Sequence, residues 1–232
     1  MVAGENGEHT EVGHAGSMGV RRGRILKEGY PFVLPPLGLG VLGFALGWPL
    51  LGWPGLATAL GMALFFRNPM RRPLRDARLA LSPADGKVVE ICPVESLEGQ
   101  DGSFIKISVF MSVLNVHVNR SPVSGQVVEV RHFPGRFDPA YRGEASRNNE
   151  RNSVRIRMAR GGEITCVQVA GVLARRIVSW VQPGAFLLQG APIGMIRFGS
   201  RVDTYFPAGF EPDVELGQRV WGGETILGYF HG

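Results

Sequence analysis

The chain has 232 residues, enough for one globular domain and an appendage, and its formal net charge is +5. Nearly all of its basic residues are arginines, because the only lysines are Lys27, Lys87 and Lys106. Arginine suits phosphate groups, but the chain shows no zinc finger, RNA-binding aromatic motif or basic helix, so a nucleic-acid partner is not expected.

The N-terminal quarter of the chain predicts a tail followed by an apolar hairpin. Residues 1–28 begin without hydrophobic periodicity and are expected to be a disordered tail. Residues 29–67 are expected to form this hairpin, because the 35 residues from Phe32 to Phe66 are all uncharged, too many for one membrane span of about 20, and prolines at 49 and 54 break the stretch in two. Arginines flank both ends, which places both ends on the cytoplasmic side. Two short spans and a hairpin embedded in one leaflet both fit this pattern, and the sequence leaves that choice open.

The residue pattern changes at residue 68, where short runs rich in Val and Ile alternate with Gly and Pro turns. This spacing is typical of β-strands. The expected strands are Lys87–Ile91, Ile105–Phe110, Gln126–Val130, Val154–Met158, Ile164–Val169 and Met195–Phe198. Residues 175–180 fit either a short helix or another strand. Cys92 and Cys166 lack a CxxC spacing and are expected to be buried apolar residues rather than a disulfide.

The strand region also repeats itself. Residues 82–91 match residues 121–130, and residues 181–193 match residues 214–226, with glycines at the same offsets. Such repeats suit short hairpins stacked into a sandwich. The predicted fold is therefore mainly β, a β-sandwich or barrel-sandwich with short helices over 68–232, preceded by an α-helical membrane hairpin.

Chemistry can be assigned to the pair Gly199-Ser200. A serine hydroxyl that loses its proton to a base can attack the preceding carbonyl and convert the amide into an ester. Loss of the Ser200 α-proton then eliminates the ester, leaving Gly199 as a C-terminus and a dehydroalanine that hydrolyses to a pyruvoyl group. His117, in an extended Val-His-Val run, is a candidate base, and Asp85, in an Ala-Asp-Gly turn, is a candidate carboxylate to orient it.

Three motifs carry a family resemblance. They are Ser-Pro-Ala-Asp-Gly at 82–86, Phe-Met-Ser followed by Asn-Val-His-Val-Asn-Arg-Ser-Pro between 110 and 122, and Phe-Gly-Ser-Arg-Val-Asp at 198–203. In this order they resemble the phosphatidylserine decarboxylase proenzymes in their short form. The resemblance implies self-cleavage into a β chain of residues 1–199 and an α chain of residues 200–232. It implies a pyruvoyl cofactor made from Ser200, which forms a Schiff base with the substrate amine, and no metal or pyridoxal phosphate.

The resemblance also has departures. The longer bacterial form carries a second histidine three residues before the conserved one, where this chain has Leu114, so His117 is the hypothesis for both proton-handling roles. His132 is a spare histidine without motif support. The polar stretch 142–152 resembles an Asn-Glu-Arg-Asn element of the short form, and Arg147 and Arg151 are candidate contacts for the lipid phosphate or serine carboxylate.

Taken together, these patterns and the resemblance predict an enzyme that decarboxylates phosphatidylserine at the cytoplasmic face of the cell membrane. An ether-lipid (archaetidylserine) substrate is the close alternative. A membrane serine hydrolase with the same triad would leave the chain uncleaved, and a biotin- or lipoate-type carrier would need a lysine at a hairpin tip, which the sequence lacks. The oligomeric state stays open, with a homo-oligomer among the options.

Overall fold

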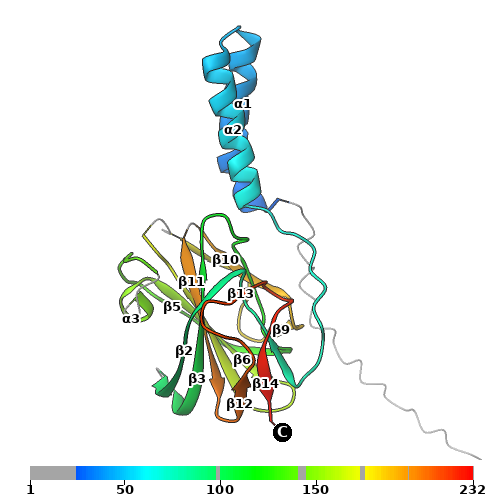
Figure 1. Cartoon of the computed structure of the whole chain (residues 1–232), viewed down its shortest axis with the longest axis vertical. Coiled ribbons are helices and arrows are strands. Elements are labelled where there is room, and N and C mark those ends of the chain that lie inside the picture. Colours follow the sequence, from blue (N-terminus) through cyan, green and yellow to red (C-terminus); the bar gives the residue numbers. More distant parts are fainter. Residues whose placement is uncertain (1–24, 98–99, 141–144, 173–175, 198, 232) are drawn as a thin grey trace, which may run out of the picture.

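A computed structural model describes residues 25–97, 100–140, 145–172, 176–197 and 199–231 (Figure 1). It shows a rod of two helices that projects from one end of a β-rich domain. The expectation of a mainly β fold is confirmed, and the predicted helix pair is present. Tail residues 1–24 lie outside the described residues.

The rod is a helical hairpin with glycine on the inside. After a 3-10 turn, η1 (Lys27–Gly29), helix α1 (Tyr30–Ala45) runs out and helix α2 (Pro49–Phe65) returns. At the seam a Cβ on Gly43 would lie 2.7 Å from the Gly52 nitrogen, and a Cβ on Gly55 would lie 2.6 Å from the Gly40 Cα. The backbones therefore approach as closely as in membrane helix pairs with small-residue interfaces.

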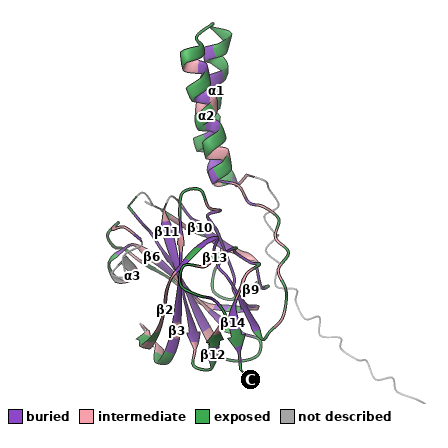
Figure 2. Ribbon diagram, viewed as in Figure 1, coloured by how far each residue is buried: buried purple, intermediate pink, exposed green. Residues whose placement is uncertain are grey.

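Large apolar side chains cover the outside of the hairpin, and Figure 2 shows exposed residues along much of both helices. The exposed apolar residues include Leu34, Leu37, Leu39, Val41, Leu42, Phe44, Leu46, Trp48, Leu50, Trp53, Leu60 and Leu64. Among the described residues, no helix combines the length and the hydropathy of a bilayer-crossing segment.

The β domain is built on one curled eight-stranded sheet with the order β13-β2-β3-β11-β7-β6-β5-β9. Its strands are β2 (Gly86–Leu97), β3 (Gln100–Met111), β5 (Gly125–Phe133), β6 (Arg151–Met158), β7 (Glu163–Val169), β9 (Phe186–Leu187), β11 (Ser200–Pro207) and β13 (Arg219–Val220). Neighbouring strands are antiparallel throughout.

Two three-stranded sheets complete the domain, with the orders β1-β14-β12 and β4-β10-β8. They comprise β1 (Leu79–Leu81), β14 (Ile226–Phe230), β12 (Phe210–Pro212), β4 (Val118–Arg120), β10 (Pro192–Ile196) and β8 (Ile177–Ser179). The core lies between the inner face of the large sheet and these smaller ones, with Ile107, Ile156 and Leu227 fully buried. A single turn of helix, α3 (Ala145–Asn148), precedes β6.

The sequence repeats are matched by repeated structure. Ser82 and Ser121 each donate a hydroxyl hydrogen bond to the carbonyl two residues on, at 2.7 and 2.6 Å. Gly86 and Gly125 then start β2 and β5 with the same close approach, because a Cβ on either would lie 2.1 or 2.2 Å from the carbonyl oxygen of the neighbouring strand. The order of the large sheet accordingly reads as two related halves, β13-β2-β3-β11 and β7-β6-β5-β9.

Two local predictions needed the structure to settle them. The ambiguous segment 175–180 forms strand β8 in its described part, where the backbone pairs with β10. Cys166 is fully buried, whereas Cys92 is partly exposed, and both thiols are free.

The base of the hairpin packs directly on the β domain. Leu26, Phe65 and Phe66 form one apolar cluster with Val116 and Val118, the two residues that flank His117 in the sequence. The indole of Trp180 donates a 3.0 Å hydrogen bond to Glu28 just before α1. This end of the domain therefore holds both the helix termini and the histidine that the motifs single out.

Candidate active site

Ser200 occupies the first position of β11, in the middle of the large sheet between β3 and β7. It pairs with Met111 of β3, and its side chain is fully buried. Within the described part of the chain, its hydroxyl oxygen has no hydrogen-bond partner. An unpaired buried hydroxyl is costly, which marks this serine as a functional candidate.

The peptide bond before Ser200 sits in a constrained turn. Gly199 has a φ of +40°, a left-handed conformation that side chains disfavour. Its carbonyl oxygen lies against Gly171, where an added Cβ would approach that oxygen to 2.1 Å. Two glycines thus allow the carbonyl of the Gly199–Ser200 bond to occupy a crowded position.

His117 lies immediately before β4 and is almost completely buried. Its Nδ1 is 3.0 Å from the carbonyl oxygen of Asn115, which can only accept, so Nδ1 carries the proton. Nε2 of neutral His117 is then a proton acceptor, and it has no partner among the described residues. Burial lowers the pKa of His117 from 6.5 to about 4, with the Asn115 carbonyl opposing and the Arg67 cation reinforcing the shift, so the ring is neutral at pH 7.

Strand register indicates that His117 and Ser200 face the same interior. Alternate residues of an extended chain point the same way, so His117 shares a face with Asn119. The Asn119 amide lies 3.5 Å from the sulfur of Met111, the residue directly opposite Ser200. The predicted nucleophile and the predicted base are thus linked through Met111 and Asn119, and both are buried.

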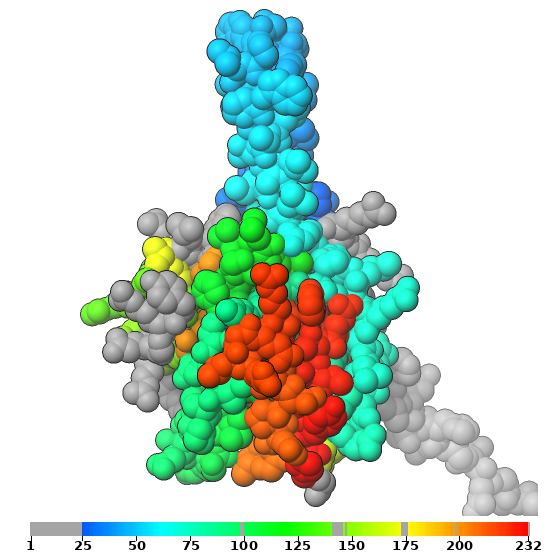
Figure 3. Space-filling model, in the orientation of Figure 1, coloured from blue at the N-terminus to red at the C-terminus, as the bar shows by residue number. Residues whose placement is uncertain are grey.

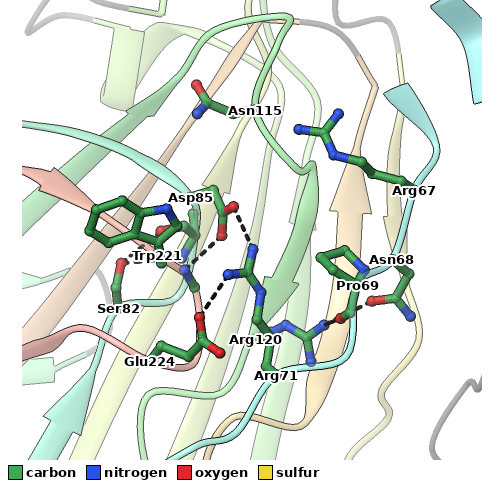
Figure 4. Close-up of polar contacts among 12 residues, drawn as sticks. Arg67, Asn68, Pro69, Arg71, Ser82, Asp85, Asn115, Arg120, Trp221 and Glu224 are labelled. Atoms are coloured by element: carbon green, nitrogen blue, oxygen red, sulfur yellow. Dashed lines mark hydrogen bonds and ion pairs between the residues drawn. The ribbon is translucent and has the colours of Figure 1, made fainter. Parts of the chain in front are cut away.

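Asp85 is bonded to other partners than His117, among them Arg71 (Figure 4). One carboxylate oxygen accepts a 2.6 Å hydrogen bond from Arg71, and the other accepts a 2.7 Å bond from the Gly222 backbone. Arg71 also bridges to Glu224 at 2.8 Å. The Asn115 carbonyl occupies the Nδ1 position of His117, so the predicted orienting bond from Asp85 is absent in this arrangement.

A buried row of hydrogen-bonded side-chain amides lies near the site, and the sequence motifs did not predict it. Asn152 donates to Gln168 at 3.0 Å, and Gln168 donates to Asn119 at 2.8 Å. All three side chains are almost fully buried. Gln168 stands among apolar residues of a strand buried on both faces, and a polar residue in such a run was the available signal.

The opposite face of β11 carries a charged cluster. Arg201 pairs with Asp203 at 2.7 Å between Nε and Oδ1, and Lys106 pairs with Glu90 at 2.9 Å. Beside this cluster the large sheet curls around a polar cavity of about 830 Å³, which Arg151 lines. Arg151 pairs in register with Val169, as Arg201 does, so it belongs to this face and not to the face of Ser200.

The remaining candidates are scattered. The side chain of Arg147 lies outside the described residues, although its backbone forms part of α3. His132 is exposed on β5, and Leu114 is 80% exposed at the tip of a turn. The described residues contain no cluster of three or more His, Cys, Asp or Glu side chains placed to hold a metal ion.

A buried serine behind a constrained glycine, in a domain that also buries a neutral histidine, has the features of a self-processing type of site. Comparison with known proteins gives the family: residues 59–228 match the family model for phosphatidylserine decarboxylase. The phosphatidylserine decarboxylase proenzymes of Mycobacterium bovis (strain BCG / Pasteur 1173P2) and Mycobacterium tuberculosis (strain ATCC 25618 / H37Rv) are each 46% identical over 202 residues, covering 86% of this chain and 87% of theirs. The Mycobacterium marinum proenzyme is 47% identical over 206 residues, 88% of this chain and 85% of its own. The chain belongs to the phosphatidylserine decarboxylase family.

Proposed function

We propose that this protein is a carboxy-lyase that converts phosphatidylserine into phosphatidylethanolamine and carbon dioxide after cleaving itself between Gly199 and Ser200. Family membership supports the substrate and the reaction. The observation that carries self-cleavage is the pair of buried, unpartnered atoms among the described residues, Ser200 Oγ and His117 Nε2, on one face of the fold. Because the relatives are phosphatidylserine decarboxylase proenzymes, this reaction is favoured over an ether-lipid substrate or a serine hydrolase.

In the proposed cleavage, His117 Nε2 takes the proton of the Ser200 hydroxyl, and Oγ attacks the Gly199 carbonyl carbon. The C–N bond breaks as the serine nitrogen receives a proton, leaving an ester between Gly199 and Ser200. A base then removes the Ser200 α-proton and the Gly199 carboxylate departs. His117 is our candidate for this second proton transfer, because Leu114 replaces the other histidine and is exposed away from the site.

Asp85 keeps an electrostatic role in this proposal. Its negative charge favours the imidazolium that forms at His117 when the serine proton is taken, even without a direct bond. The salt bridge to Arg71 and the bond from Gly222 fix the position of that charge.

The surroundings of Ser200 suit a pyruvoyl group. The position is fully buried in the centre of a sheet. Among the described residues, the donor group of the Asn119 amide has only the Met111 thioether, a weak acceptor, as its partner. Lys106 lies on the opposite face in an ion pair with Glu90, so it is not placed to hold a pyridoxal cofactor at Ser200. A pyruvoyl carbonyl supplies the electron sink that amino-acid decarboxylation requires.

The hairpin supports a membrane location for the enzyme. Its two helices pack through glycines and expose their leucines and tryptophans. A helix pair in water would instead bury its large apolar side chains between the helices. Both ends of the hairpin return to the β domain, so the site lies next to the surface at which the hairpin enters the bilayer (Figure 1). Arginines at both ends favour the cytoplasmic face.

The activity is tested by incubating the purified full chain with vesicles of phosphatidylcholine and phosphatidylserine and measuring phosphatidylethanolamine and carbon dioxide. Wild type is expected to form both in equal amounts, whereas Ser200→Ala forms neither. His132→Ala is the matched control and should retain turnover. Product formation by Ser200→Ala would refute the role of this serine, and no product from cleaved wild type would refute the substrate.

A further inference from the structure

The turn between β3 and β4 presents two apolar side chains where turns usually carry polar residues. Val113 is 46% exposed and Leu114 is 80% exposed at its tip. The Asn115 backbone donates to the Ser112 carbonyl at 3.0 Å, and the Asn115 side chain accepts from the Ser112 backbone at 2.9 Å. Hydrogen bonds between Ser112 and Asn115 therefore close the turn at its base, and its apolar tip is left exposed.

The same turn is fastened to the end of the hairpin. Arg67, two residues beyond α2, donates to the Leu114 carbonyl at 2.7 Å and to the Leu64 carbonyl at 2.6 Å. One guanidinium therefore joins the tip to the last turn of the helix. Figure 3 shows the green surface of this region directly beneath the base of the hairpin.

Several arginines lie at this end of the domain, near the acidic Glu28. Arg197 lies 5.3 Å from the centre of the Phe32 ring in the first turn of α1, which places it at the base of the hairpin. The Arg197 backbone bonds to the Arg176 carbonyl at 3.2 Å, and Arg176 is exposed. Apolar side chains amid arginines match an anionic lipid surface, where the tails accept the former and the phosphates the latter.

We propose that the Val113–Leu114 tip inserts into the interfacial layer of an anionic phospholipid membrane and sets the height of the site above it. This inference rests on the proposed function for the identity of the lipid. The tip directly precedes Asn115, whose carbonyl fixes the His117 tautomer, so insertion positions the histidine relative to lipid headgroups. Leu114 thus acts as a membrane contact at the position where the longer bacterial form has its second histidine.

The direct test labels the tip with the environment-sensitive fluorophore NBD. Leu114→Cys and the control Phe186→Cys are made in a Cys92→Ser full-length chain, because Cys166 is fully buried. Phe186 is 58% exposed on β9, a strand on the side of the domain (Figure 1). Vesicles of equal parts phosphatidylcholine and phosphatidylserine are added, with or without spin-labelled acyl chains.

NBD at position 114 is expected to shift to the blue and be quenched by the spin labels, while NBD at position 186 does neither. An unchanged spectrum at 114, or equal quenching at both positions, would overturn the proposal. A blue shift at 114 that follows protein concentration without lipid would assign the tip to a second copy instead and would also overturn it.

A second measurement separates insertion from chemistry. The double variant Val113→Ser, Leu114→Ser should lower kcat/KM for vesicle phosphatidylserine about tenfold. It should leave self-cleavage and turnover of a soluble short-chain phosphatidylserine unchanged. Equal loss on both substrates would contradict membrane insertion. Wild type that turns over neither substrate, with normal NBD quenching at 114, would count against the proposed function alone.

Discussion

The ring of Phe65, the last residue of α2, lies over the imidazole of His117 with 4.2 Å between their centres. The last residue of the hairpin thus covers one face of His117, which we propose as the base. Burial is the main cause that lowers the pKa of His117 to about 4, and this ring is part of that burial. The helical hairpin and the candidate base are therefore in direct contact through these two rings.

Removing the Phe65 ring should change the pH dependence of cleavage. In Phe65→Ala, water reaches His117 and its pKa rises from about 4 toward 6.5. More of the base is then protonated between pH 5 and pH 6, so cleavage of the variant slows there and stays near wild type above pH 7. Cleavage rates measured on gels across this range test the prediction. Phe44→Ala, which removes a ring paired with Trp53, is the control and should keep the wild-type profile.

Burial of neutral His117 should also make stability depend on pH. Unfolding restores the pKa to 6.5, so between about pH 6.5 and pH 4 the unfolded chain binds more protons and stability falls as the pH falls. Relative to pH 7.5, the loss at pH 5 should be up to about 2 kcal/mol of unfolding free energy. Urea unfolding of Ser200→Ala, which keeps one chain, is compared with the same protein carrying His117→Gln. A pH dependence that survives His117→Gln undiminished would contradict the assignment.

Gly171 should be required for cleavage although it carries no functional group. In Gly171→Ala the new methyl would collide with the Gly199 carbonyl oxygen, since the unrelaxed separation is only 2.1 Å. We expect cleavage to slow at least about a hundredfold because the carbonyl leaves its attack position. The matched control is Gly38→Ala in α1, where an added Cβ meets nothing within 4 Å. Normal cleavage in Gly171→Ala would show that this carbonyl position is not used.

Asp85 and its partner Arg71 should behave differently if the carboxylate acts by its charge. Asp85→Asn keeps an acceptor for the Gly222 backbone but loses the negative charge, so cleavage should slow at least about tenfold. Arg71→Gln leaves that charge in place and should cleave at a rate near wild type. Equal slowing in both variants would instead mean that Asp85 serves only to anchor residue 71 and its neighbours.

Much of the β architecture could be predicted from the repeats in the sequence. Glycines at matching offsets predicted the paired halves of the sheet because Gly86 and Gly125 meet a neighbouring carbonyl in the same way. Ser200 and His117 could be proposed as site residues because their motifs, taken together and in order, resemble those of one family. The partners of Asp85 could not be predicted, because Arg71 and Gly222 are brought to it only by tertiary packing. The amide chain through Gln168 likewise depends on cross-strand register.

The most direct test of the central claim is the intact mass of the purified full chain beside the Ser200→Ala variant. The account predicts two wild-type fragments that meet between Gly199 and Ser200, with the smaller one bearing a keto group in place of its terminal amine. Ser200→Ala should remain a single full-length species. A wild-type preparation that decarboxylates phosphatidylserine as one uncleaved chain would contradict the account.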